Sequence, residues 1–178
     1  MGLSITGVSY DYKINEEEGD FEGEEFSSTD IGYFGYKFFR DALIEFCTDG
    51  RLNLDSNYGG GPLAWCFYDD ETYEILFEPE DFSEERLKNP KVQEYQRKLN
   101  SLKKDYPKLY EVYDFVCHCD AEGIVPAKTC KRLLPILKEF YQADKKNYGY
   151  SGWDYNFTEN LISILEEVVQ VGGKLYFS

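Results

Sequence analysis

Residues 106–142 read YPKLYEVYDFVCHCDAEGIVPAKTCKRLLPILKEFYQ, a pattern that predicts two helices joined by a polar loop. Before the loop, apolar residues recur at spacings of three and four behind Pro107, which suits the first turn of a helix. After the loop, Pro126 can open a second helix with the same apolar spacing. Gly123 can take the left-handed conformation that ends a helix or turns a loop. Pro135 lies inside the second pattern, so we expect a kink or two short helices there.

Patterning on both sides of this stretch predicts a small sheet and further helices. β-prone residues predict strands over 3–12, over 175–177 and in a hairpin over 63–77. Helices are expected over residues 33–46, 90–102 and 153–171, with a mobile loop over 15–28 and helix caps at one of residues 28–30, at Gly50 and at Asp81. We therefore expect a single α+β domain, residues 1–178, mainly helical, with a small, mostly antiparallel sheet.

The charge of the chain is strongly negative and unevenly distributed. It carries 34 acidic and 19 basic residues, a formal net charge of -15. One acidic segment contains Glu16, Glu17, Glu18, Asp20, Glu22, Glu24 and Glu25, and a second contains Asp69, Asp70, Glu71, Glu74, Glu78, Glu80, Asp81, Glu84 and Glu85. Such a chain repels nucleic acid at long range and is steered toward basic protein surfaces. The alternative is that the acids only keep the protein in solution.

The polar loop of the opening stretch contains the only histidine of the chain. Its candidate ligand residues are Cys117, His118, Cys119, Asp120 and Glu122. A calcium loop with Gly123 at its invariant glycine would need a glutamate at Thr129, and the spacing Cys-x-Cys is too tight for an ordinary zinc site. The structural interpretation is a helix end with small buried thiols. We therefore expect no metal and no cofactor, and keep a ligand-binding loop as an alternative.

Catalysis has little support in the sequence. A nucleophile with a histidine base would have to use His118, and its neighbours Cys117 and Cys119 are adjacent in sequence, whereas catalytic partners usually converge from separate segments. No apolar run has the length of a membrane span, and the first residues lack a signal peptide's basic and apolar regions. The 5 cysteines stand at scattered positions. These features predict a non-enzymatic cytoplasmic protein with reduced thiols and no membrane contact.

Three short motifs carry a resemblance to known proteins. They are His118 to Pro126 followed by Cys130 and Leu133-Leu134, the start Met1-Gly2-Leu3, and the end Gly173-Lys174-Leu175-Tyr176-Phe177. Together they resemble small acidic hypothetical proteins of phages and bacterial genomes, whose motif reads roughly His-Ser-Asp-Cys-Asp/Glu-Gly. This chain differs in having Cys119 in place of serine and in the order Asp120-Ala121-Glu122. The resemblance covers the C-terminal third and the first few residues, implies a phage or mobile-element origin, and assigns no catalytic residue.

These observations lead to three functional hypotheses. The first is a non-catalytic phage-type protein that binds and inhibits a host defence protein with a basic surface, in the host cytoplasm, without contacting nucleic acid directly. Its contact residues would be Glu16, Glu17, Glu18, Glu24, Glu25, Asp69, Asp70, Glu71 and Glu74. The second is a small-molecule, nucleotide or metal-binding protein that uses the loop over 117–123. The third is an immunity protein that neutralises a toxin. The sequence leaves the oligomeric state open.

Overall fold

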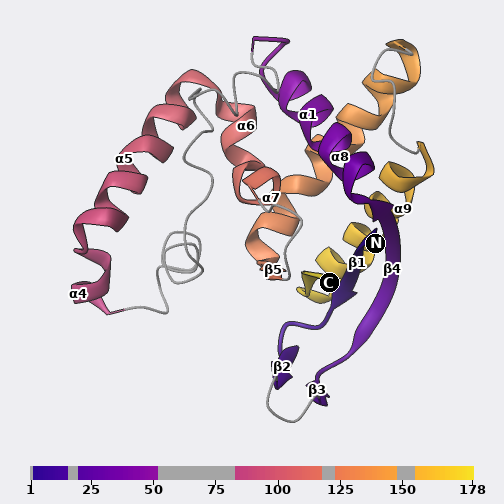
Figure 1. Cartoon of the computed structure of the whole chain (residues 1–178), viewed down its shortest axis with the longest axis horizontal. Coiled ribbons are helices and arrows are strands. Elements are labelled where there is room, and N and C mark those ends of the chain that lie inside the picture. The colour runs from indigo at the N-terminus through magenta and orange to yellow at the C-terminus, as the bar shows by residue number, and fades with distance from the viewer. Residues whose placement is uncertain (1, 16–19, 52–82, 118–122, 148–154) are drawn as a thin grey trace. The chain divides into compact units, whose positions relative to one another are not determined.

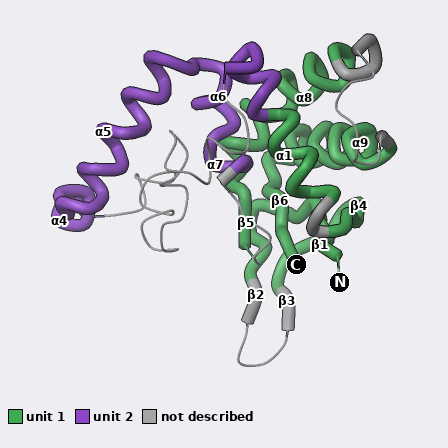
Figure 2. The backbone as a smooth tube through the Cα atoms, turned by 45° about the horizontal axis from the view of Figure 1, so that its top comes forward, with its two compact units in different colours: residues 1–43, 118–178 green, residues 44–117 purple. Residues whose placement is uncertain are grey.

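The computed structural model of the chain describes residues 2–15, 20–51, 83–117, 123–147 and 155–178 (Figure 1). Within these residues the fold is α+β and mainly helical, with a four-stranded antiparallel sheet, which confirms the predicted class. The chain divides into two compact units, residues 1–43 with 118–178 and residues 44–117 (Figure 2). The predicted hairpin over 63–77 and the loop over 118–122 lie outside the described residues.

The main sheet belongs to the first unit and joins distant parts of the chain. Its strands are β1 (Gly2–Val8), β4 (Glu25–Gly32), β5 (Gly123–Val125) and β6 (Lys174–Phe177), in the order β4-β1-β6-β5. All neighbouring pairs are antiparallel. The terminal strand predicted over 175–177 is confirmed, and it lies between β1 and β5. Gly123 is extended in β5, so the predicted left-handed turn at this position is wrong.

The N-terminal region contains more strand than its sequence predicts. β1 ends at Val8, short of the predicted residue 12, because the chain turns and the Tyr12 N–H donates to the Ser9 carbonyl oxygen at 3.2 Å. The segment expected to be a loop, residues 15–28, begins at the last residue of β2 (Lys13–Asn15) and contains its partner β3 (Asp20–Glu22) and the start of β4. Residues 28–30 are paired with β1, so the predicted helix cap there is wrong.

One face of the sheet is buried under α9 (Tyr155–Val171). Leu3 and Ile5 of β1 are buried on this face. Gly7 continues the same face, and a Cβ built on it would lie 2.8 Å from Cγ2 of Val168 in α9. The absence of a side chain at Gly7 therefore permits the close approach of helix and strand. The helix predicted over 153–171 is confirmed, beginning at Tyr155.

Aromatic rings fill the core of the first unit between α1 (Tyr33–Cys47), α8 (Ala127–Asn147) and α9. The ring centroid of Phe39 lies 5.9 Å from that of Phe140 and 5.0 Å from that of Phe157, and both pairs are edge to face. Tyr36 meets Phe177 of β6 with ring centroids 5.9 Å apart. α8 continues through Pro135 as one helix, so the prediction of two short helices is wrong.

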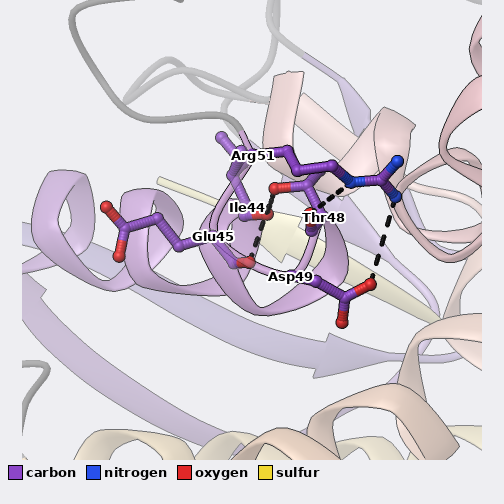
Figure 3. Close-up of polar contacts among 5 residues, drawn as sticks. All are labelled: Ile44, Glu45, Thr48, Asp49 and Arg51. Carbon is purple, nitrogen blue, oxygen red and sulfur yellow. Dashed lines mark hydrogen bonds and ion pairs between the residues drawn. The ribbon is translucent and has the colours of Figure 1, made fainter.

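The end of α1 is closed by local hydrogen bonds (Figure 3). The Thr48 hydroxyl donates to the Ile44 carbonyl oxygen at 2.9 Å, and the Arg51 Nε donates to the Thr48 carbonyl oxygen at 3.0 Å. Gly50 has a φ of 72° and donates its N–H to the Glu45 carbonyl oxygen at 2.8 Å. The positive φ of Gly50 and these hydrogen bonds end α1, which confirms the helix stop predicted at Gly50.

The rest of the second unit, as far as it is described, consists of one longer helix, α5 (Pro90–Asp105), and three short ones. The short helices are α4 (Glu84–Leu87), α6 (Pro107–Glu111) and α7 (Tyr113–Cys117). The cap of α4 is Ser83, in place of the predicted Asp81. The apolar spacing of Val92, Tyr95, Leu99 and Leu102 predicts one buried stripe along α5; Val92, Leu99 and Leu102 are buried, and Tyr95 is half-buried. The helix predicted after Pro107 is interrupted at Val112, whose N–H donates to the Leu109 carbonyl oxygen at 3.1 Å.

Candidate functional site

Most of the residues proposed for partner or ligand binding lie outside the described residues. They are Glu16, Glu17, Glu18, Asp69, Asp70, Glu71, Glu74, His118, Cys119, Asp120 and Glu122. Cys117 is the last residue of α7. Glu24 and Glu25 are described, and both are exposed at the start of β4. A candidate interface can therefore be described around Glu24 and Glu25.

Ser9 joins the turn after β1 to the start of β4. Its N–H donates to the Glu24 carbonyl oxygen at 2.9 Å, and its Oγ accepts from the Glu24 N–H at 2.9 Å. The same hydroxyl donates to Oδ1 of Asp11 at 2.6 Å. The hydrogen bond from Ser9 is the main reason that the pKa of Asp11 lies below its usual value, so this carboxylate is charged at neutral pH.

Tyr12 anchors the other end of the turn. Its side chain is buried, with its ring centroid 5.6 Å from that of Tyr176 in β6. Its hydroxyl donates to Oε1 of Glu25 at 2.8 Å. Burial, followed by this hydrogen bond and the nearby negative charge, raises the pKa of Tyr12, so the phenol stays protonated at neutral pH. Glu25 therefore has a structural role in addition to its proposed role in partner binding.

Between these two anchors Tyr10 points into solvent. Its side chain is 67% exposed, the largest exposed fraction among the large hydrophobic residues that are described as exposed. The Nζ atom of Lys174 lies 4.9 Å from the ring centroid. Tyr10 was predicted to be an apolar strand position, and its exposure follows from the turn that ends β1 early. We call Tyr10, Asp11, Glu24 and Glu25 the Tyr10 surface.

The Tyr10 surface combines an aromatic ring with three carboxylates on a hydrogen-bonded frame. The acidic run identifies Glu24 and Glu25 from sequence, whereas Ser9, Tyr10 and Asp11 were not predicted as site residues. The Ser-x-Asp order is typical of turns in which a side chain bonds nearby backbone, and that signal could have identified the turn. It could not have identified the partner strand, because β4 lies more than ten residues away along the chain.

Other candidate groups of the chain have structural explanations. Cys130 is buried, and its thiol lies 3.6 Å from the Val125 carbonyl oxygen, while Cys47 is also buried. Thr129, which a calcium loop would need as glutamate, is buried and accepts from Arg132 at 3.1 Å. The buried carboxylate of Asp114 accepts from the Phe115 N–H at 3.2 Å.

Neither a metal site nor a membrane-spanning helix occurs in the described part of the chain. No group of three or more histidine, cysteine, aspartate or glutamate side chains is arranged there to hold a metal ion. Among the described helices, none combines the length and the apolar character that crossing a bilayer requires.

The basic side chains on and around α5 and α6 make local contacts inside the second unit. Lys98 pairs with Glu94 at 2.9 Å, Lys103 lies 5.0 Å from the ring centroid of Tyr110, and Arg51 lies 4.9 Å from that of Tyr106. Contacts of this kind are typical of a solvated helix face whose long side chains lie along neighbouring rings. They do not single out a ligand.

Comparisons with known proteins leave the assignment to the residues themselves. No protein-family model, curated protein or solved structure matches the chain. The geometry of the Tyr10 surface and the charge of the chain are therefore the observations from which a function can be argued.

Proposed function

We propose that this chain is a non-catalytic interaction protein that binds a basic surface of another protein through the Tyr10 surface. The observation that carries the proposal is the solvent-exposed ring of Tyr10, in the turn where Asp11 follows it and Ser9 bonds the Glu24 backbone. The phage-type resemblance leads us to propose further that the partner is a host defence protein, which the chain inhibits in the host cytoplasm. The acidic candidates outside the described residues, Glu16, Glu17, Glu18, Asp69, Asp70, Glu71 and Glu74, stay proposed contact residues.

An exposed tyrosine on a fixed frame is well suited to anchor an interface. Tyrosine supplies a large contact area with only two rotatable side-chain bonds, so little conformational entropy is lost on binding. Here Lys174 lies against the ring, and Ser9 holds the turn to β4, so the ring is already positioned before a partner arrives. Anchors of this kind commonly contribute 2 kcal/mol or more, about a thirtyfold change in affinity.

The acids around the ring would act mainly on the rate of encounter. With a formal net charge of -15, the chain attracts basic surfaces over distances comparable to the Debye length. The pKa of Asp11 is lowered by its hydrogen bond from Ser9, so this charge persists well below neutral pH. Binding through these residues should therefore weaken as salt is added.

The chemistry of the Tyr10 surface favours binding over catalysis. The Ser9 hydroxyl is engaged with the carboxylate of Asp11 and with a backbone N–H, and the Tyr12 phenol has a raised pKa. The groups that remain accessible, an aromatic ring and carboxylates, are recognition elements.

The test compares two exposed aromatic residues on different elements, each with a lysine beside its ring. Tyr10 lies in the turn next to Asp11, with Lys174 4.9 Å from its ring centroid, whereas Phe38 of α1 is 44% exposed and has Lys37 5.5 Å from its ring centroid. Tagged parent protein, Tyr10→Ala and Phe38→Ala would each be used to capture partners from host lysate, with washes at low and then high salt. The captured protein would be identified by mass spectrometry, purified and titrated against all three chains.

We expect one abundant partner with a basic surface, released at high salt, that binds Phe38→Ala as well as it binds the parent. Tyr10→Ala should bind it at least about tenfold more weakly. Equal affinity of Tyr10→Ala and the parent for the purified partner would refute the assignment of this surface. A captured toxin in place of a defence protein would retain the interface and change the biological role to immunity. Loss of binding on replacing His118 alone would instead favour the loop over 117–123.

A further inference from the structure

Strand β4 forms one edge of the main sheet, as Figure 1 shows. It is eight residues long and pairs with β1 on one side. No described strand pairs with its other side. Such an edge presents unpaired backbone N–H and C=O groups, onto which another extended chain can add as a further strand.

The register of the sheet identifies which residues face this open edge. Ser4 of β1 exchanges two backbone hydrogen bonds with Ser178, at 2.9 and 3.1 Å, so its backbone groups point toward β6. Because successive residues of a strand alternate in direction, the backbone groups of Leu3 and Ile5 point toward β4. Their partners there are Ile31 and Thr29. It follows that the backbone groups of the intervening residues, Ser28 and Asp30, point away from β1.

The side chains at the open edge are small or acidic. Ser28 and Asp30 are exposed, whereas Thr29 and Ile31 are buried on the face that contacts α9. The open stretch has a defined end, because the register shifts after Ser28 and the Ser27 N–H donates to Oε2 of Glu167 at 3.3 Å. An added strand would therefore pair with residues 28–32, before α1 begins.

We infer that the partner adds an extended, basic segment to this edge as a fifth strand of the sheet. The inference builds on the proposed function, because it assigns a binding mode to the same partner. In either strand direction, the residues opposite Ser28 and Asp30 have their side chains on the face away from α9. A lysine or arginine opposite Asp30 would form a cross-strand ion pair, and Glu25 lies farther along the same strand.

Charge decides which occupant fits the edge. A second copy of this chain would bring another formal charge of -15 and another Asp30 to the same strand edge, and like charges directly opposite each other are destabilising. An acidic or phosphorylated segment would be repelled in the same way. A basic segment gains both backbone hydrogen bonds and favourable charge pairs, and the alternation of basic residues would match the strand period of two.

The probe for this inference is the capped peptide Thr-Lys-Val-Lys-Val-Lys-Thr, titrated to about 1 mM into the isotope-labelled full chain and followed by amide chemical shifts. One control peptide has glutamate in place of each lysine. The other keeps the side chains but carries a methyl group on the backbone nitrogens of its lysines and valines, which removes the donors that would face β4 in either strand direction. Two variants of the protein, Asp30→Pro and Asp30→Asn, are titrated with the same peptides.

These two variants separate the backbone contribution from the charge. Proline at position 30 removes an N–H that points outward and leaves the pairing with β1 intact. Asparagine keeps that N–H and removes the charge. We expect the basic peptide to shift the amides of Ser28 and Asp30 and to slow their hydrogen exchange. Asp30→Asn and Asp30→Pro should both weaken binding, and Asp30→Pro should weaken it further, by about tenfold relative to the parent.

Several results would overturn the inference. They are an absence of shifts at Ser28 and Asp30 with the basic peptide, equal binding of the N-methylated peptide, and equal binding by Asp30→Pro. A dimer of the free chain that Asp30→Pro dissociates would assign the edge to a second copy and so also overturn it. If the captured partner still binds Asp30→Pro but not Tyr10→Ala, the proposed function stands and the strand addition fails. If neither variant changes partner binding, both fail.

Discussion

The packing of α1 gives a sharp prediction, because two adjacent phenylalanines of this helix lie in opposite environments. Phe39 is fully buried, and three aromatic rings lie within 6.4 Å of its ring centroid. Phe38 is 44% exposed, with Lys37 beside its ring. The substitutions Phe39→Ala and Phe38→Ala remove the same atoms from the same helix, so their difference reports the environment alone.

The expected magnitudes differ several-fold. Truncating a fully buried phenylalanine costs about 3–5 kcal/mol, through lost apolar contact and the cavity left behind. Each edge-to-face ring pair adds about 0.5–1.5 kcal/mol beyond area burial, which places Phe39→Ala toward the upper end. For Phe38→Ala we expect less than about 1 kcal/mol, mostly from the exposed contact with Lys37. Since domains are stable by only about 5–15 kcal/mol, the first change removes a large fraction of the total.

Urea unfolding followed by far-ultraviolet circular dichroism measures both values. With a slope of about 2 kcal/mol per molar urea, Phe39→Ala should lower the midpoint by about 1.5–2.5 M and Phe38→Ala by less than about 0.5 M. Phe39→Leu, which keeps most of the volume, should fall between them and remain folded in water. Similar midpoints for the two alanine variants would refute the placement of Phe39 in the aromatic core.

Three further predictions concern the turn after β1 and the end of α9. Tyr12 has a raised pKa in the folded protein, so the stability it contributes is complete below about pH 10 and is lost as the pH rises above that value. The free energy of unfolding should therefore fall more steeply with pH in the parent than in Tyr12→Phe. Equal slopes would contradict the buried hydrogen bond. Ser9→Ala should raise the pKa of Asp11 toward its usual value in a carboxyl NMR titration, and an unchanged pKa would mean that the hydroxyl is not its main hydrogen-bond donor. Gly173→Ala should destabilise the fold by at least about 1–3 kcal/mol in thermal unfolding, because the added Cβ would collide with a backbone carbonyl of β1. In Gly172→Ala the added Cβ meets no atom within 4 Å, so this change should cost only about 1 kcal/mol, for the positive φ of Gly172. Equal effects of the two glycine substitutions would argue against the close approach of β6 to β1.

The amino-acid sequence determined those elements whose causes are local. The buried positions Phe157, Leu161 and Val168 recur along α9 at helical spacing, and the glycines at positions 50 and 172 have the positive φ that ends a helix. The α+β class, the terminal strand and the stripe on α5 followed from the same short-range patterns. A helical period or a cap involves residues only a few positions apart, so it can be read without knowing the rest of the fold.

The tertiary structure decided what depends on pairing between distant segments. Residues 28–30 have the composition of a helix cap, yet they form a strand because β1 offers backbone partners and α9 buries Thr29. Tyr10 looks like one more apolar strand residue, and the turn that exposes its ring is held by hydrogen bonds of Ser9 to Tyr12 and to the distant Glu24. β4 became the open edge of the sheet because β6 joined β1 on its other side, a choice made between residues at opposite ends of the chain. Strand pairing and burial are free-energy gains between segments far apart in sequence, so they override local preference and cannot be read from it.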